Sequence, residues 1–166
     1  VGAQGFVVLN APRVENRGHI GTADGGQVHL AATRHLDLAT RDGQLLSLRT
    51  DAPGGLGESP FQGVVNNAGR IQANGLSVGP GGTVTLVAEN GTTYHGGDIL
   101  ANGASLGGQV DVLGREVRLD GRVEANGATG GGRIRVGGDY QGANPELANA
   151  DTLDVGGGAS LLANAL

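Results

Sequence analysis

Cysteine is absent from the 166 residues of this chain, so the fold contains neither a disulfide nor a thiolate metal site. Lysine is absent as well, and the 11 cationic side chains, all arginine, are scattered along a chain of formal net charge −5. Nucleic-acid binding needs clustered cations, so this charge pattern argues against a nucleic-acid partner. A phosphate loop of the G-x-x-x-x-G-K-S/T type is excluded, because it needs a lysine.

Aromatic side chains are scarce, with 2 Phe, 2 Tyr and no Trp. The core must therefore be built from Val, Leu, Ile and Ala, which suits thin, regular layers. No apolar run approaches the roughly 18 residues that cross a bilayer, so we expect no membrane span. The length predicts one domain, and because the sequence begins at Val1 without Met or a signal peptide, we expect residues 1–166 to be a single segment of a longer protein.

Glycine is abundant, at 34 of 166 residues, whereas about 7% is usual. Many glycines belong to a repeated unit, G-x-I/V-x-A-N-G, then a short spacer, then G-G-x-V/I-x-L/V. The unit recurs over residues 16–30, 67–86, 95–112 and 119–136, and a third alternating stretch follows in some units, at 35–38, 116–119 and 152–155. Each unit is predicted to hold up to three strands of three to five residues, separated by Asn-Gly or Gly-Gly corners.

The spacing of the units decides between hairpins and stacked coils. Asn-Gly turns normally predict antiparallel hairpins. Equivalent aliphatic residues nevertheless recur periodically: Ile71 and Ile99 are 28 positions apart, Ile99 and Val123 are 24 apart, and Ile20 precedes Ile71 by 51, which fits two coils with an insertion. Stacking them at the spacing of parallel strands, about 4.8 Å, predicts an all-β, right-handed parallel β-helix of roughly 24 residues per coil.

The same alignment predicts which side chains meet. One inward column should contain Val84, Val110 and Ile134, and another should contain Leu86, Val112 and Val136. On the outer surface, Asp98 should lie between Arg70 and Arg122 in a charge ladder, and Asp111 should lie beside Arg135.

The most glycine-rich stretch, V-E-A-N-G-A-T-G-G-G-R-I-R-V-G-G at 123–138, is interpreted through the same alignment. Its glycines are predicted to form corners rather than a phosphate cradle. Val123, Ala125, Ile134 and Val136 should point inward, and Glu124, Arg133 and Arg135 should face water.

Two stretches break the repeat, near 50–63 and 138–150, and are predicted to be loop excursions. Loops on a rigid scaffold often carry binding residues, so Phe61, Asp139 and Tyr140 are the candidate interaction residues. The alternative is that both loops are solvated excursions without a partner, with Phe61 and Tyr140 folded back onto the shaft.

Several blocks resemble the filamentous-haemagglutinin-like (TpsA-type) exoproteins of bacterial two-partner secretion systems. They are G-F-V-V-L-N-A-P-R-V-E-N-R-G-H-I (5–20), G-G-Q-V-H-L-A-A (25–32), V-E-A-N-G-A-T-G-G-G-R-I-R-V-G-G-D-Y-Q-G (123–142), N-A-D-T-L-D-V (149–155) and G-A-S-L-L-A-N-A (158–165). The block from Ala125 to Gly142 is the most specific. The N-P-N-G-type and N-P-N-L-type motifs of the family's secretion signal are not present, so we expect the distal part of a secretion domain or an early part of the shaft.

This resemblance implies a long secreted right-handed β-helix, which passes through the periplasm and crosses the outer membrane through a partner transporter. The product would be displayed on the bacterial cell surface or released. Such proteins often act in cell adhesion and virulence, through a receptor on a host or neighbouring cell that these residues do not identify.

An enzyme is the main alternative, because polysaccharide lyases and hydrolases resemble this fold and use clustered carboxylates, arginine or a metal. The candidate carboxylates are Asp98, Asp111, Glu116, Asp120 and Glu124. The alignment places Asp111 and Glu124 on different strands, each near an arginine, so a solvated charged face is expected instead. The four histidines, His19, His29, His35 and His95, lack a zinc-type spacing such as H-E-x-x-H. We therefore expect a rigid scaffold and interaction surface that is not an enzyme, with no catalytic residue, no cofactor and no metal.

Overall fold

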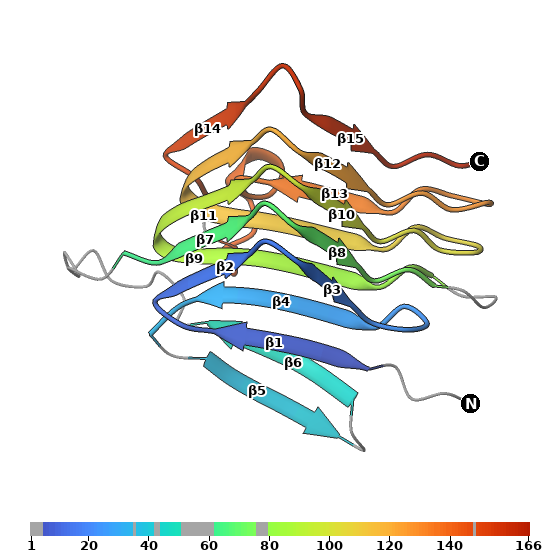
Figure 1. The fold of residues 1–166 in the computed structure, drawn as a ribbon, viewed down its shortest axis with the longest axis horizontal. Helices are drawn as coiled ribbons and strands as arrows, with labels where there is room; N and C mark the ends of the chain where they lie inside the picture. Colours follow the sequence, from blue (N-terminus) through green and yellow to red (C-terminus); the bar gives the residue numbers. More distant parts are fainter. Residues whose placement is uncertain (1–4, 35, 42–43, 51–61, 76–79, 148) are drawn as a thin grey trace.

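The computed structural model describes residues 5–34, 36–41, 44–50, 62–75, 80–147 and 149–166. Within these residues the chain is all-β except for one short 3-10 helix, η1 (Tyr140–Gly142). The strands lie in three stacked rows, and every pairing within a row is parallel (Figure 1). This architecture is consistent with a parallel β-helix.

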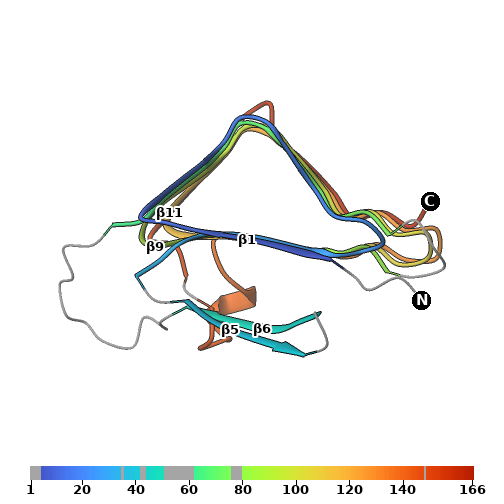
Figure 2. The ribbon, with the colours of Figure 1, turned by 60° about the horizontal axis from the view of Figure 1, so that its bottom comes forward.

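Each row takes one strand from each successive passage of the chain. The first row contains β1 (Phe6–Asn10), β4 (Gln27–Ala32), β9 (Thr83–His95), β11 (Gln109–Leu119) and β13 (Arg133–Val136). The second row contains β2 (Arg13–Asn16), β7 (Val64–Asn67), the C-terminal parts of β9 and β11, and β14 (Thr152–Val155). The third row contains β3 (His19–Gly21), β8 (Arg70–Gln72), β10 (Asp98–Leu100), β12 (Arg122–Glu124) and β15 (Ser160–Leu162). Viewed nearly end-on, the rows form the sides of a triangle (Figure 2).

Two strands are longer than the sequence predicts, because they pass from the first row into the second. β9 has 13 residues and β11 has 11. β9 bends at Asn90, whose φ of 50° is left-handed, and at Gly91, where a Cβ would collide with the Gly63 backbone. The pairing of β9 with β11 is irregular between Gly114 and Glu116, at the same bend. A bend within one continuous strand, at which the pairing is locally interrupted, therefore replaces the corner expected here.

The predicted columns of inward side chains are confirmed by the strand register. Ile71, Ile99 and Val123 are partners across β8, β10 and β12. The columns Val84–Val110–Ile134 and Leu86–Val112–Val136 are found as well. Most of these side chains are fully buried, and each such aliphatic burial contributes roughly 1.5–3 kcal/mol to stability.

The structure corrects the sequence interpretation of the segment after β4. Ile20 pairs directly with Ile71, so their 51 positions contain one passage of the chain with an insertion, not two coils. The predicted third stretch at 35–38 lies outside the rows: Leu36–Arg41 is β5, which pairs antiparallel with β6 (Gln44–Thr50) in a hairpin. The periodic recurrence of the units argued against antiparallel hairpins, but the alternating residues of β5 form one with β6.

The structure describes the two predicted excursions to different extents. Most of the first, residues 51–61, lies outside the described residues. The second leaves the sheet after β13 and returns at β14, and it carries η1. Nowhere in the described ranges does the chain form a helix with the length and apolarity needed to cross a bilayer.

Candidate functional site

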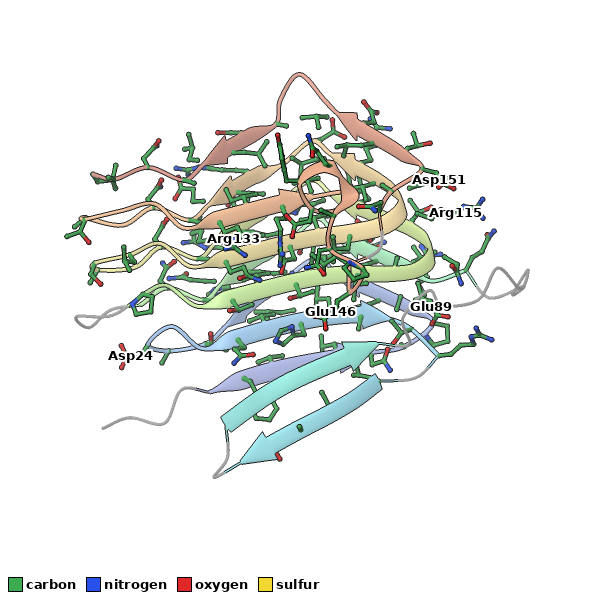
Figure 3. All side chains as sticks on the ribbon, turned by 180° about the vertical axis from the view of Figure 1, so that it is seen from behind. Asp24, Glu89, Arg115, Arg133, Glu146 and Asp151 are labelled. Atoms are coloured by element: carbon green, nitrogen blue, oxygen red, sulfur yellow. The ribbon has the colours of Figure 1, made fainter. Side chains whose placement is uncertain are left out.

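Two segments that do not belong to the rows lie against the outer surface of the first row. The loop 137–151 and the β5–β6 hairpin both lie outside this side of the triangle (Figures 2 and 3). On this side of the sheet, outward side chains are buried, including Ala31, Leu113 and Asp111. This surface therefore consists of sheet residues together with the segments that cover them.

Arg135 attaches the loop to the sheet. Its Nε and Nη2 donate to the two carboxylate oxygens of Asp111, at 2.6 and 2.9 Å, and its Nη1 donates to Asp139 Oδ2 at 3.1 Å. Gln109 Nε2 donates to the same Asp111 carboxylate at 2.7 Å. The prediction that Asp111 lies beside Arg135 is confirmed. The two side chains form a bidentate ion pair, with two hydrogen bonds from the guanidinium to the carboxylate.

Asp139 has a positioning role at the start of η1. Its Oδ1 accepts a hydrogen bond from the Tyr140 backbone N–H at 2.8 Å, which caps the short helix. This backbone hydrogen bond, supported by Arg135, lowers the pKa of the Asp139 carboxyl. The carboxylate is therefore held in its charged, hydrogen-bonded form.

Tyr140 projects from the same loop into solvent. Its exposed fraction is 79%, so the expectation that this ring folds back onto the shaft is wrong. The loop is held by Asp139 and Arg135 and needs no apolar anchor at Tyr140. Phe61, the third candidate interaction residue, lies outside the described residues.

The candidate carboxylates do not converge on one point. Asp111 binds Arg135 on the outer side of the first row, whereas Glu124 lies in the third row and binds Arg122 and Asn102 Nδ2. Glu116 accepts from Thr92 Oγ1 at 3.2 Å, and Asp120 binds Arg118 at 2.9 Å. These carboxylates bind side chains of neighbouring strands or of their own strand, an arrangement that fixes position.

The prediction that Glu124 and Arg135 face water is wrong. The exposed fraction of the Glu124 side chain is 10%, and that of Arg135 is 13%. Asp111 is likewise buried, so the solvated charged face expected for it is absent. Arg133 is exposed, as predicted.

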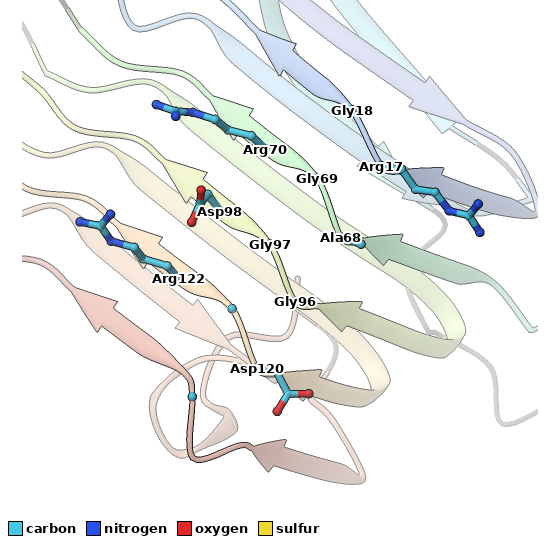
Figure 4. Close-up of a pocket in the computed structure, with 12 residues that line it drawn as sticks. Arg17, Gly18, Ala68, Gly69, Arg70, Gly96, Gly97, Asp98, Asp120 and Arg122 are labelled. Carbon is cyan, nitrogen blue, oxygen red and sulfur yellow. The ribbon is translucent and has the colours of Figure 1, made fainter.

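An open groove follows the corner between the second and third rows (Figure 4). Its floor is glycine backbone, and its lining residues are Arg17, Gly18, Ala68, Gly69, Arg70, Gly96, Gly97, Asp98, Asp120, Gly121, Arg122 and Gly158. A Cβ at Gly69, Gly97 or Gly121 would collide with a backbone carbonyl of the preceding passage, so close stacking of the backbone requires these glycines. The groove follows from this close stacking.

The predicted charge ladder lies on one wall of this groove. Asp98 is the register partner of both Arg70 and Arg122, so the predicted order is confirmed. No ion pair joins these three described side chains, because Arg122 binds Glu124 instead. The three residues are therefore aligned by the strand register but are not joined by direct ion pairs.

The described histidines occupy separate sites. His19 is exposed on β3, and His29 lies on the outer side of β4, where Gln27 Oε1 is 3.0 Å from its Nε2. Burial lowers the pKa of His29 to about 4, although the Asp111 carboxylate opposes this shift. Among the described residues, His, Cys, Asp and Glu side chains form no group of three or more suited to a metal ion.

Two ladders of hydrogen-bonded polar side chains were not predicted from the sequence. In the first, the buried side chains of Asn16, Asn67 and His95 hydrogen-bond from one passage to the next. In the second, each asparagine side-chain oxygen accepts the backbone N–H of the next one, along Asn74, Asn102, Asn126 and Asn164. The repeated A-N-G of the unit was the available signal for the second ladder, and the aligned Asn, Asn and His before each corner was the signal for the first.

Comparison of the sequence with protein-family models and with characterised proteins gives no match. Comparison of the fold with solved structures gives a match to the crystal structure of the HMW1 secretion domain from Haemophilus influenzae, with a TM-score of 0.68. The match covers 91% of this chain at 20% sequence identity, and the chain spans about a third (33%) of the length of the matched structure. At this identity the likeness is one of fold.

Proposed function

We propose that this chain is a segment of a large exoprotein that bacteria export by two-partner secretion, and that it acts as a rigid scaffold and interaction surface. Its architecture would be a right-handed parallel β-helix of roughly 24 residues per coil, the spacing found between the partners Ile99 and Val123. The product would be secreted or displayed on the cell surface as an adhesin. An outer-membrane transporter would be its export partner, and a receptor on another cell its binding partner.

The observation that carries the proposal is the fold match to a secretion domain over 91% of the chain. The blocks that resemble filamentous-haemagglutinin-like exoproteins support the same assignment. They lie toward both ends of the chain, at 5–32 and 123–165. Stacked parallel strands can also fold by addition of neighbour to neighbour, which suits a chain that emerges progressively from a pore.

The interaction surface is assigned to the loop 137–151 on the outer side of the first row. A side chain as exposed as Tyr140, on a loop fixed by Arg135 and Asp139, is pre-positioned for contact with a partner. Aromatic side chains on fixed loops commonly act as anchors in protein interfaces.

Export can be tested in the source bacterium with an epitope tag at Ala143, an exposed residue of this loop. Antibody should label intact cells or the culture medium, and deletion of the partner transporter should abolish this labelling. Labelling that requires permeabilised cells while the transporter is present would refute export. A Tyr140→Ala variant should be exported normally and should bind target cells less well, with Arg133→Ala as an exposed control on β13.

We propose that the segment has no catalytic activity. The separation of Asp111 from Glu124, each bound to its own arginine, supports this assignment. The purified chain should release no reducing sugars or unsaturated products from a panel of polysaccharides. Cleavage that disappears in an Asp111→Asn or Glu124→Gln variant would establish the alternative, a polysaccharide lyase or hydrolase.

A further inference from the structure

The inner side of the corner beneath the groove contains a continuous hydrogen-bonded ladder. Asn16 Nδ2 donates to Asn67 Oδ1 at 2.7 Å, and Asn67 Nδ2 lies 3.0 Å from His95 Nδ1. His95 Nε2 lies 3.1 Å from the Arg122 carbonyl oxygen. The three side chains are buried, with exposed fractions of 6%, 0% and 0%, so water does not substitute for these partners.

Backbone groups at both ends fix the direction of this ladder. The Arg122 carbonyl only accepts, so His95 must carry its proton on Nε2, and its Nδ1 is then the acceptor for Asn67. At the other end, the Gly18 backbone N–H donates to Asn16 Oδ1 at 3.1 Å. Neither amide can turn over without breaking a hydrogen bond, so the ladder has one satisfied state when His95 is neutral.

A proton on His95 Nδ1 removes that state. Nδ1 then becomes a donor that faces the Asn67 amide nitrogen, and Asn67 must turn over to offer its oxygen. Asn16 must turn over in response, and its amide nitrogen then faces the Gly18 N–H. Within the side-chain contacts of the ladder, one donor–donor contact then remains, and it falls at Gly18, which is exposed.

We propose that the Asn16–Asn67–His95 ladder is a proton-sensitive latch, which closes the corner at Arg17 and Gly18 when His95 is neutral and releases it when His95 is protonated. The latch would loosen the N-terminal corner of the shaft in acid while the aliphatic columns stay packed. The device does not depend on the proposed export route, because it rests only on contacts within the described chain.

The surroundings of His95 favour the neutral imidazole. Burial lowers its pKa, opposed by hydrogen bonding to the backbone of Arg122 and of Asn67 and by the charge of Asp98. The next member of its column is Leu119, an apolar register partner. The remaining charged groups at this corner line the outer groove (Figure 4); they are Arg17, Arg70, Asp120 and Arg122. Glu15, Tyr94 and Arg118 alternate with the inward residues of β2, β9 and β11, and therefore point outward.

The test uses the 166-residue chain carrying His19→Gln and His29→Gln, which remove an exposed histidine near Gly18 and a second buried one. Imidazole nitrogen NMR between pH 8 and 4 should find the Nε2–H form of His95 at neutral pH. The protection factor of the Gly18 amide should fall about tenfold with the His95 titration, the equivalent of one mismatched hydrogen bond, while that of Val110 is constant. A His95→Leu variant should lose this pH dependence.

An Asn16→Ala variant separates the latch from simple burial. Without Asn16, Asn67 turns over freely, so His95 should titrate about one pH unit higher. Asn74→Ala, which removes an amide from the other ladder, should leave the titration unchanged. An unchanged midpoint in Asn16→Ala, an Nδ1–H tautomer at neutral pH, or a Gly18 amide indifferent to the protonation of His95 would each overturn the latch.

Discussion

Arg135 and Asp111, 24 residues apart in sequence, form a bidentate ion pair across β13 and β11, with distances of 2.6 and 2.9 Å. The exposed fractions of the two side chains are 13% and 7%. The third guanidinium nitrogen binds Asp139. One side chain therefore joins two strands of the first row to the loop that covers them.

Replacing Arg135 by Leu should lower the free energy of unfolding by about 3–5 kcal/mol, because it leaves the Asp111 carboxylate buried without its counter-charge. Urea unfolding at pH 7.5 measures this loss. Arg115→Leu is the matched control: Arg115 binds Asp151 at 2.6 Å, but both side chains are more than half exposed, so its loss should leave stability nearly unchanged. Equal effects of the two substitutions would contradict the structural role of the Arg135 contact.

Stability should fall in mild acid because of His29. Its pKa is about 4 in the folded chain and 6.5 when unfolded, so the unfolded chain binds more protons between these values and becomes favoured as the pH falls. At about 1.4 kcal/mol for each pH unit across this window, the loss approaches about 3 kcal/mol by pH 4. Urea unfolding at pH 7.5, 6, 5 and 4.5 measures the slope.

The control for the acid effect is a pair of substitutions. His29→Gln should reduce the slope between pH 6.5 and 4 and leave the contribution of the second buried histidine, His95, whereas His19→Gln, at an exposed position on β3, should leave it as it is. A slope unchanged by His29→Gln would assign the acid sensitivity to other groups.

The stacked columns were predictable because the sequence repeats the pattern that builds them. Ile71, Ile99 and Val123 occupy equivalent positions in successive units, and parallel strands place equivalent residues side by side. The order of Arg70, Asp98 and Arg122 followed from the same register. Local repetition alone therefore specifies both the inward and the outward partners in the rows.

The burial of Glu124 and Arg135 was not predictable from that pattern. Both alternate with inward aliphatic residues, which normally indicates a solvent-facing side chain. Arg135 is buried because the loop 137–151, which has no repeat, lies over β13, and Glu124 is buried against Arg122 and Asn102. When a non-repeating segment covers a strand, the alternation of apolar and polar residues in that strand does not change, so the sequence pattern does not reveal the coverage.

The β5–β6 hairpin was missed for a related reason. Leu36 and Leu38 alternate with polar residues in the same way as the strands of the rows, so periodicity does not distinguish a strand inside the stack from one outside it. The difference lies in the partner: Leu38 pairs with Leu48, only ten positions later, instead of with an equivalent residue of another unit.

The second asparagine ladder should contribute measurably to stability. Asn102 Oδ1 accepts the Asn126 N–H at 2.8 Å, and Asn102 Nδ2 donates to the buried Glu124 at 3.0 Å. Asn102→Ala leaves both groups without this partner, and we expect a loss of about 1–3 kcal/mol. In urea unfolding, Asn164→Ala should change little, because Asn164 is exposed and its side chain accepts no hydrogen bond in the described structure.

Gly132, in the glycine-rich stretch at 130–132, should be intolerant of even one methyl group. A Cβ at Gly132 would collide with the carbonyl oxygen of Gly108 on the preceding passage, and backbone cannot move aside as a side chain does. Gly132→Ala should therefore cost about 1–3 kcal/mol or more through forced separation of the stacked backbones. Gly157→Ala is the control, since a Cβ there meets nothing within 4 Å and its φ is not left-handed. By restricting the unfolded chain, Gly157→Ala should raise stability by about 0.4–1 kcal/mol, so the two glycine substitutions are expected to shift the urea midpoint in opposite directions.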